Sequence, residues 1–260
     1  MFFRLIVALA VFAFASAKVL EGSKVSASIK DTECSVDGLG VNLEAPFKFN
    51  DWVVGFKYKL ANLQKGPESV FAKKSFDMGD DDTVKIDADY TLADQVVGVT
   101  ATWESDSLDM TVKAEGNSKE KMTKVSALKD LMMGDNKLSL KAVYDIPGKI
   151  ASGFAKYDVE SKAVVAVDYS TEDSDPVLSV SKALDDNNEV SPSISLKSGS
   201  LAYAWKRTWE GGSLKAKLFP GDKVDVEWKD DGAGGAWTTN AEFPLDSSNA
   251  KVSFAREWNY

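Results

Sequence analysis

The stretch Lys223-Val224-Asp225-Val226-Glu227-Trp228-Lys229 decides the fold of this chain, because charged and apolar residues alternate in it without a break. Successive side chains on a β-strand point to opposite faces, so this segment predicts a strand with one apolar and one charged face. The same alternation recurs more than a dozen times along the chain, for example over residues 52–60 and 108–115. The sequence therefore predicts an all-β protein.

The segments between these strands are short and polar, which favours hairpin connections. No segment shows the helical periodicity that a crossover between parallel strands requires. No Pro/Ser-rich linker divides the chain. We therefore predict one antiparallel, up-and-down β-barrel of roughly twelve or more strands, with strands near 24–30, 39–48, 52–61, 69–76, 83–92, 96–104, 108–115, 122–129, 136–146, 150–158, 162–170, 177–184, 190–197, 200–209, 213–219, 222–229, 235–243 and 250–259.

Composition excludes several classes of function. The formal net charge is −9 and the pI is about 4.8, which argues against nucleic acid as a partner. The chain has no histidine and a single cysteine, Cys34, so it can form neither a Ser-His-Asp nor a Cys-His nucleophile system, nor a thiolate and imidazole zinc site. We expect no enzyme activity, no metal site and no cofactor.

The first seventeen residues have the layout of a secretory signal peptide. Arg4 precedes an apolar core over residues 5–14, and Ala15-Ser16-Ala17 supplies small residues before a cleavage point at Lys18. The apolar core is shorter than the ~20 residues of a membrane-spanning helix. We expect residues 1–17 to be a signal peptide and residues 18–260 to form the barrel domain.

The side of the sheet on which the apolar face lies distinguishes a membrane pore from a soluble β-protein. An apolar lumen in a barrel of this size could not be packed, so a large barrel favours lipid outside and water inside. Predicted strands of eight to ten residues and aromatic residues at strand ends fit a membrane barrel as well. The alternative is a secreted or organelle-lumen β-sandwich or barrel that binds a lipid or pigment or serves as a structural partner. Burial of Val54, Val226 and Trp228 in a packed interior would favour this alternative.

The polar face supplies the candidate site. Acidic pairs two residues apart on one strand could bind a cation, but a charged or pore-lining wall is the simpler interpretation. Lysines on the same faces would contact anions in a lumen. The candidate pore-lining residues are Lys57, Lys59, Asp87, Asp89, Lys113, Lys141, Lys215, Lys217, Asp225 and Glu227.

The last third of the chain resembles the chloroplast outer-envelope pore proteins of the 24 type. The resemblance lies in Gly211-Gly212-Ser213-Leu214-Lys215-Ala216, in residues 224–228 and in Glu257-Trp258-Asn259. It implies a weakly selective, water-filled channel in the plastid outer envelope that passes small charged metabolites, contacts membrane lipid, needs no cofactor and could form a homo-oligomer. The plant members of this family have no signal peptide, whereas this chain begins with the predicted one. A signal peptide would suit an alga whose plastid lies behind an additional membrane.

Overall fold

The computed structural model describes residues 24–29, 39–59, 66–159, 163–232, 235–246 and 250–259. The predicted signal peptide, Cys34 and Tyr260 lie outside these residues. The described residues form eighteen strands, and none of them forms a helix long and apolar enough to span a membrane. The strands are β1 (Lys24–Ile29), β2 (Leu39–Phe49), β3 (Trp52–Lys59), β4 (Ser69–Asp77), β5 (Asp82–Thr91), β6 (Val96–Ser105), β7 (Met110–Asn117), β8 (Lys121–Met133), β9 (Asn136–Asp145), β10 (Ile150–Val159), β11 (Ala163–Ser170), β12 (Val177–Ala183), β13 (Asn188–Ser195), β14 (Leu201–Trp209), β15 (Gly212–Phe219), β16 (Lys223–Gly232), β17 (Gly235–Pro244) and β18 (Lys251–Asn259).

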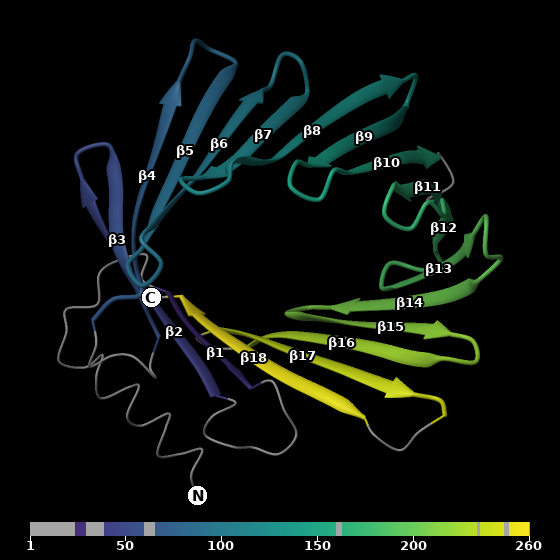
Figure 1. Cartoon of the computed structure of the whole chain (residues 1–260). Helices are drawn as coiled ribbons and strands as arrows, with labels where there is room; N and C mark the ends of the chain where they lie inside the picture. The colour runs from purple at the N-terminus through teal and green to yellow at the C-terminus, as the bar shows by residue number, and fades with distance from the viewer. Residues whose placement is uncertain are drawn as a thin grey trace, which may run out of the picture.

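Each strand pairs antiparallel with its neighbours in sequence, and β1 pairs with both β2 and β18. The sheet therefore closes on itself, and Figure 1 shows a ring with no described element at its centre. This confirms the predicted single up-and-down β-barrel of twelve or more strands. At a strand spacing of about 4.8 Å and a tilt of about 40°, eighteen strands close at a backbone radius of about 18 Å. Barrels of this size leave an aqueous channel.

The two rims of the barrel carry different parts of the chain. Lys24 at the start of β1 pairs with Asn259 at the end of β18, so we call the rim that holds them the terminal rim. The turn at Asn50-Asp51 lies at the terminal rim, and Asn50 takes a positive φ of 52° there. Gly134 and Gly211, with φ of 65° and 78°, occupy corresponding turns. These tight turns use residues that tolerate the left-handed region, as two-residue hairpins require.

Three prolines lie where the ladder does not need their missing N–H. Pro244 is the last residue of β17, and Pro46 lies in the part of β2 that extends beyond the pairing with β1. Pro192 pairs with Tyr203 of β14, but the pairing of β13 with β12 is interrupted at that point. Proline has no N–H to donate to a ladder, so positions of this kind are the ones that strands tolerate.

Several strands, namely β3, β7, β8, β13 and β16, differ by two residues or more from the predicted segments. β7 begins at Met110 and not at residue 108, because residues 106–109 form the preceding turn. β8 extends to Met133 and not to residue 129, and its register with β7 shifts at Glu115/Gly116. A bulge of this kind adds a residue to one strand and changes which residues face each other.

The described part of the barrel has no packed core. Phe71 and Ala202 are its only buried hydrophobic residues. Val54 and Val226 are half-buried, and Trp228 is 51% exposed. A soluble barrel would have to bury these side chains, because an exposed apolar face of this size marks contact with another apolar phase. The expectation of a packed interior under the alternative interpretation is therefore not met.

The strand register assigns every side chain to one of two walls, because directly opposite residues of neighbouring strands share a face. One wall, which we call the apolar wall, carries Val99, Leu140, Val167, Leu218 and Phe254, all of them exposed. The other, the polar wall, carries the alternating lysines and carboxylates. The register around the closed ring keeps each wall continuous across all eighteen described strands.

Aromatic side chains on the apolar wall lie near both rims and form two girdles. The exposed members near the terminal rim include Phe49, Trp52, Phe76 and Trp209. Those near the opposite rim include Tyr90, Tyr144, Tyr169, Tyr203 and Phe243. Aromatic girdles at the two interfaces flank the apolar band of membrane barrels.

Candidate pore lining

All ten candidate residues lie on the polar wall. Lys57 and Lys59 are on β3, Asp87 and Asp89 on β5, Lys113 on β7 and Lys141 on β9; Lys215 and Lys217 are on β15, and Asp225 and Glu227 on β16. The register links them through one face: Asp87 is opposite Thr100, Lys113 opposite Thr102, and Lys215 opposite Glu227. The alternation within each strand is sufficient to predict that these residues share the polar wall, because side chains two residues apart on a strand point to the same face.

An ion pair that crosses β3 shows that the polar wall is concave. The Nζ atom of Lys73 in β4 lies 3.6 Å from Oε1 of Glu44 in β2. These strands are second neighbours, about 10 Å apart at the usual strand spacing. Gly55 lies between them on the polar wall of β3, and the ring of Phe71 covers it. Side chains of second-neighbour strands converge on the inner side of a barrel and diverge on its outer side.

Most charges of the polar wall are neutralised by near neighbours. Lys85 Nζ is 2.6 Å from Glu104, Lys113 Nζ is 2.6 Å from Glu115, and Lys137 Nζ is 2.8 Å from Asp130. The lysine side chains in these pairs are 44–46% exposed. Each pair is thus in contact with water and contributes little to stability, about 0–1 kcal/mol. Their effect is to give the wall a mixed, locally balanced charge.

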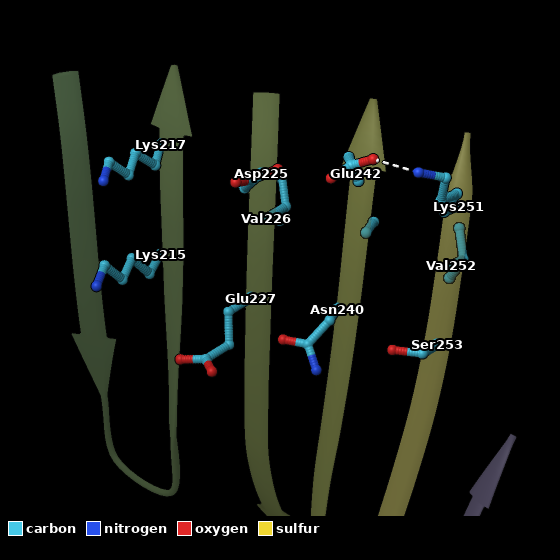
Figure 2. A pocket seen from close by; sticks show the side chains of 11 residues that line it. Lys215, Lys217, Asp225, Val226, Glu227, Asn240, Glu242, Lys251, Val252 and Ser253 are labelled. Carbon is cyan, nitrogen blue, oxygen red and sulfur yellow. Dashed lines mark hydrogen bonds and ion pairs between the residues drawn. The ribbon is translucent and has the colours of Figure 1, made fainter. Parts of the chain in front are cut away.

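Four of the ten candidates gather at one hollow of about 580 Å³ on β15–β18. Lys215, Lys217, Asp225 and Glu227 line it, together with Asn240 and Glu242 of β17 and Lys251 and Ser253 of β18 (Figure 2). The other six candidates lie on strands elsewhere on the polar wall. The structure thus brings part of the predicted set together and leaves the rest spread along the wall.

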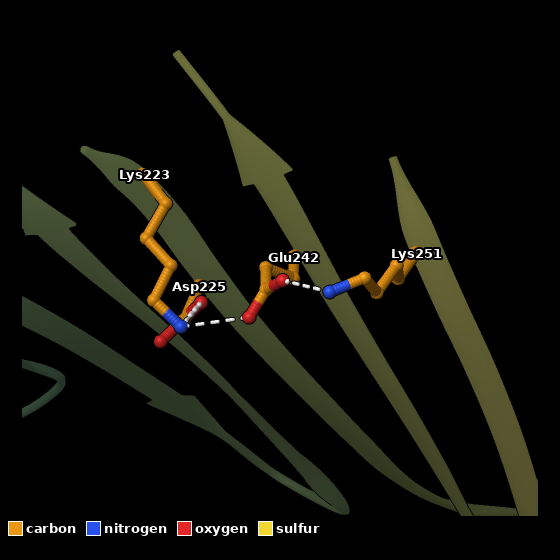
Figure 3. Close-up of polar contacts among 4 residues, drawn as sticks. All are labelled: Lys223, Asp225, Glu242 and Lys251. Carbon is orange, nitrogen blue, oxygen red and sulfur yellow. Dashed lines mark hydrogen bonds and ion pairs between the residues drawn. The ribbon is translucent and has the colours of Figure 1, made fainter. Parts of the chain in front are cut away.

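Glu242 is the centre of a charge network that spans three strands (Figure 3). Lys223 donates to Glu242 at 2.7 Å, and Lys251 donates to its other carboxylate oxygen at 2.8 Å. The Nζ atom of Lys223 also lies 3.4 Å from Asp225. Two cations and two carboxylates therefore neutralise each other on β16–β18, next to the hollow.

Lysines without a carboxylate partner adjoin this network. Lys206 of β14 and Lys215 of β15 are directly opposite each other on the polar wall, and Lys217 is the next residue on the same face. Among the described residues, no carboxylate lies within ion-pair distance of these three ammonium groups. On their other sides Lys206, Lys215 and Lys217 stand opposite Glu189, Glu227 and Asp225, so this part of the wall carries both signs. The three ammonium groups outside ion pairs are available for contact with anions.

Phe71 and Phe219 lie on the polar wall with two lysines beside each. Phe71, 2% exposed, has Lys73 Nζ at 5.1 Å and Lys57 Nζ at 5.6 Å from its ring centre. Phe219 has Lys217 Nζ at 4.6 Å and Lys223 Nζ at 5.6 Å. The ring faces attract these ammonium groups and hold them at the wall.

The sequence did not single out Glu242, Glu44 or Lys73, although each has the spacing that puts it on the polar face. Their importance comes from contacts with other strands, and the alternation within one strand does not report which residue of the next strand is opposite. No cluster of three or more metal-ligating side chains occurs among the residues that the structure describes.

The eighteen described strands form a closed, antiparallel, up-and-down β-barrel with a polar inner wall and an exposed apolar outer wall. Two solved structures of the Rhodobacter blastica porin, one carrying five substitutions and the other three, are similar to this chain. Each has a TM-score of 0.54 and 8% sequence identity, and each alignment covers 92% of this chain and 98% of the porin. At this identity the likeness concerns the fold. No protein-family model and no curated protein sequence matches the chain, so the resemblance to the chloroplast pore proteins has no support beyond the residues that suggested it.

Proposed function

We propose that this protein is a passive, weakly selective pore for small charged solutes in an outer membrane. The observation that carries the proposal is the pairing of a continuous polar inner wall with an exposed apolar outer wall around a closed eighteen-stranded ring. Water inside and lipid outside is the arrangement in which neither wall is left in an unfavourable medium.

The mixed charges of the polar wall account for weak selectivity. A solute that enters loses part of its hydration shell and gains contacts with wall lysines or carboxylates. Paired groups such as Lys85 and Glu104 present both signs within a few ångströms, so neither cations nor anions are excluded. The unpaired lysines Lys206, Lys215 and Lys217 are the anion contacts in this proposal, and small charged metabolites are the solute class.

For location we propose the outer envelope membrane of a plastid, reached through the signal peptide at residues 1–17. The support is the order of residues in the leader and the C-terminal resemblance, both described above. A fluorescent fusion of the full chain should outline plastids in an alga with a secondary plastid. A fusion that lacks residues 1–17 should stay in the cytosol, and secretion of the full-length fusion would contradict the proposed location.

Pore formation is tested by adding the mature chain, residues 18–260, to planar lipid bilayers. We expect stepwise conductance increments without a requirement for a cofactor. Protein that stays monomeric in buffer without detergent and gives no conductance would overturn the proposal and favour the soluble alternative.

The identity of the lining is tested with single cysteines in a Cys34→Ser background. Ser253 and Val252 are adjacent in β18 and lie on the polar and apolar walls, respectively. A charged, membrane-impermeant thiol reagent should change the conductance of Ser253→Cys and leave Val252→Cys unaffected. The reverse pattern would place the apolar wall inside the pore.

A further inference from the structure

The apolar wall is not uniform: it is hollowed over β7–β11. A depression of about 450 Å³ lies there, on the outer side of the barrel. We call it the outer groove. Two register rows cross it, and the residues of these rows are Met110, Lys129, Leu140, Ala155 and Val167 in the first and Ala127, Ala142, Gly153 and Tyr169 in the second.

The shape of the outer groove follows from the sizes of these side chains. Ala127, Ala142, Gly153 and Ala155 form its floor, and exposed larger side chains such as Leu140 and Tyr169 stand beside them. A Cβ atom added at Gly153 would meet no atom within 4 Å. The protein itself therefore leaves the depression empty of side chains, and a neighbouring apolar molecule has to fill it.

A cation lies at the end of the outer groove nearest the terminal rim. Lys129 stands on the apolar wall, and its ammonium group donates to the carbonyl oxygen of Leu108 in the β6–β7 turn. No carboxylate of the described residues lies within ion-pair distance of it. An ammonium group has three donors, so two remain for another acceptor. The lysine chain extends toward the rim, as basic side chains do at membrane interfaces.

We propose that the outer groove binds one anionic phospholipid, with an acyl chain on the alanine and glycine floor and its phosphate at Lys129. The inference rests on the proposed membrane location. The apolar floor of alanine and glycine suits a hydrocarbon chain, and the two free donors of Lys129 suit phosphate oxygens. A zwitterionic headgroup would bring its own cation close to Lys129, so the site discriminates in favour of anionic lipid.

The experiment is native mass spectrometry of the mature barrel released from detergent that contains equal amounts of phosphatidylglycerol and phosphatidylcholine. We expect one retained phosphatidylglycerol per barrel. Gly153→Trp fills the floor and should abolish retention, whereas Ala216→Trp, on the apolar wall of β15 outside the groove, should leave it unchanged. Lys129→Met should remove the preference for phosphatidylglycerol. Lys74→Met is the matched control, because Lys74 is an apolar-wall lysine of β4 with its own carboxylate neighbour, Asp51, at 4.0 Å.

Equal retention of the two lipids by the unmodified barrel, or equal loss in Gly153→Trp and Ala216→Trp, would overturn the inference. Conversion of a dimer to a monomer by Gly153→Trp, without a change in retained lipid, would assign the groove to a second copy of this chain instead. Conductance of the same preparations separates this test from that of the pore. Conducting barrels that retain no lipid contradict the lipid site alone, and a non-conducting unmodified barrel contradicts the pore.

Discussion

At Gly55 the barrel wall leaves no room for a side chain. A Cβ atom there would lie 2.5 Å from the ring of Phe71, and the carbonyl oxygen of Ala45 is equally close. The ring of Phe71 covers this position and is 2% exposed, which makes it the most buried hydrophobic side chain described. The Nζ atom of Lys73 lies over this ring, 5.1 Å from its centre, where it also reaches Glu44.

We therefore expect Gly55→Ala to lower the free energy of unfolding by about 2 kcal/mol, the usual effect of overpacking a filled position. Urea unfolding in detergent micelles measures this difference. Gly153→Ala is the matched control, because a Cβ atom there has open space around it and should have almost no effect. Equal stability of the two variants would show that Phe71 moves away from Gly55 without penalty.

Asp175 joins two turns at the rim opposite the termini. Its carboxylate accepts hydrogen bonds from the backbone N–H of Lys197 at 2.7 Å and of Ser198 at 3.1 Å. These bonds favour the charged carboxylate, and the backbone N–H of Lys197 is the largest cause that lowers the pKa of Asp175 below its usual range.

The pH dependence of this contact follows from the lowered pKa. The stabilising contribution is fully present above the ordinary aspartate range and is lost as the pH falls through the lowered folded-state pKa. We expect the exchange rate of the Lys197 amide proton, corrected for its intrinsic pH dependence, to rise over that acidic interval. Asp175→Asn should remove this transition, and Asp173→Asn in the same turn should preserve it. A transition that persists in Asp175→Asn would assign it to another group.

At the scale of a strand, β6 tests which wall meets lipid. Val99 and Thr100 are adjacent near the middle of the strand and lie on opposite walls. Val99 is 42% exposed. An arginine on the lipid face of a membrane barrel costs about 2–4 kcal/mol near the bilayer midplane, and an arginine in the lumen is solvated.

Val99→Arg should thus reduce the fraction of barrel that folds into lipid vesicles, and Thr100→Arg should fold like the unmodified chain. Heat-modifiable migration on gels reports the folded fraction. The opposite ranking of the two variants would mean that the polar wall, and not the apolar wall, contacts the bilayer.

At the scale of the whole molecule, the two mouths of the barrel differ in charge. The described turns at the terminal rim (residues 50–51, 78–81, 106–109, 134–135, 184–187 and 210–211) contain nine carboxylates and no lysine or arginine. The described turns at the opposite rim contain carboxylates together with Lys119, Lys149 and Lys197. A mouth of one sign concentrates counterions, so the terminal rim should favour the entry of cations.

We expect the reversal potential across a salt gradient to indicate a modest cation preference that weakens as ionic strength rises, because salt screens exposed charges. Replacement of Asp80, Asp81, Asp106 and Asp109 by asparagine should reduce this preference. The same number of neutralised carboxylates at the opposite rim, namely Asp94, Glu172, Asp173 and Asp222, should reduce it less. Equal effects of the two sets would show that the difference between the mouths does not control entry.

The sequence was sufficient to assign residues to the two walls of the barrel, but not to predict which side chains contact each other between strands. The alternation of Val224, Val226 and Trp228 with Asp225 and Glu227 assigns these residues to faces, because a strand has a strict two-residue period. The pairing of strands depends on turn lengths, on the bulge at Glu115/Gly116 and on closure between β1 and β18. For this reason the sequence predicted that Lys215 and Asp225 share a wall, but not that Glu44 contacts Lys73 across Gly55 or that the apolar wall is hollowed at Gly153.

The closure of the ring by β1 and β18 also has a consequence for biosynthesis. Every other pairing joins strands that are consecutive in the chain, whereas this one joins residues 24–29 to residues 254–259. Until β18 is synthesised, the growing sheet has two free edges that can pair with other chains. The open sheet is therefore the form of this chain that is most exposed to pairing with its copies. Deletion of β18 should yield aggregates of an open sheet, and not a smaller barrel.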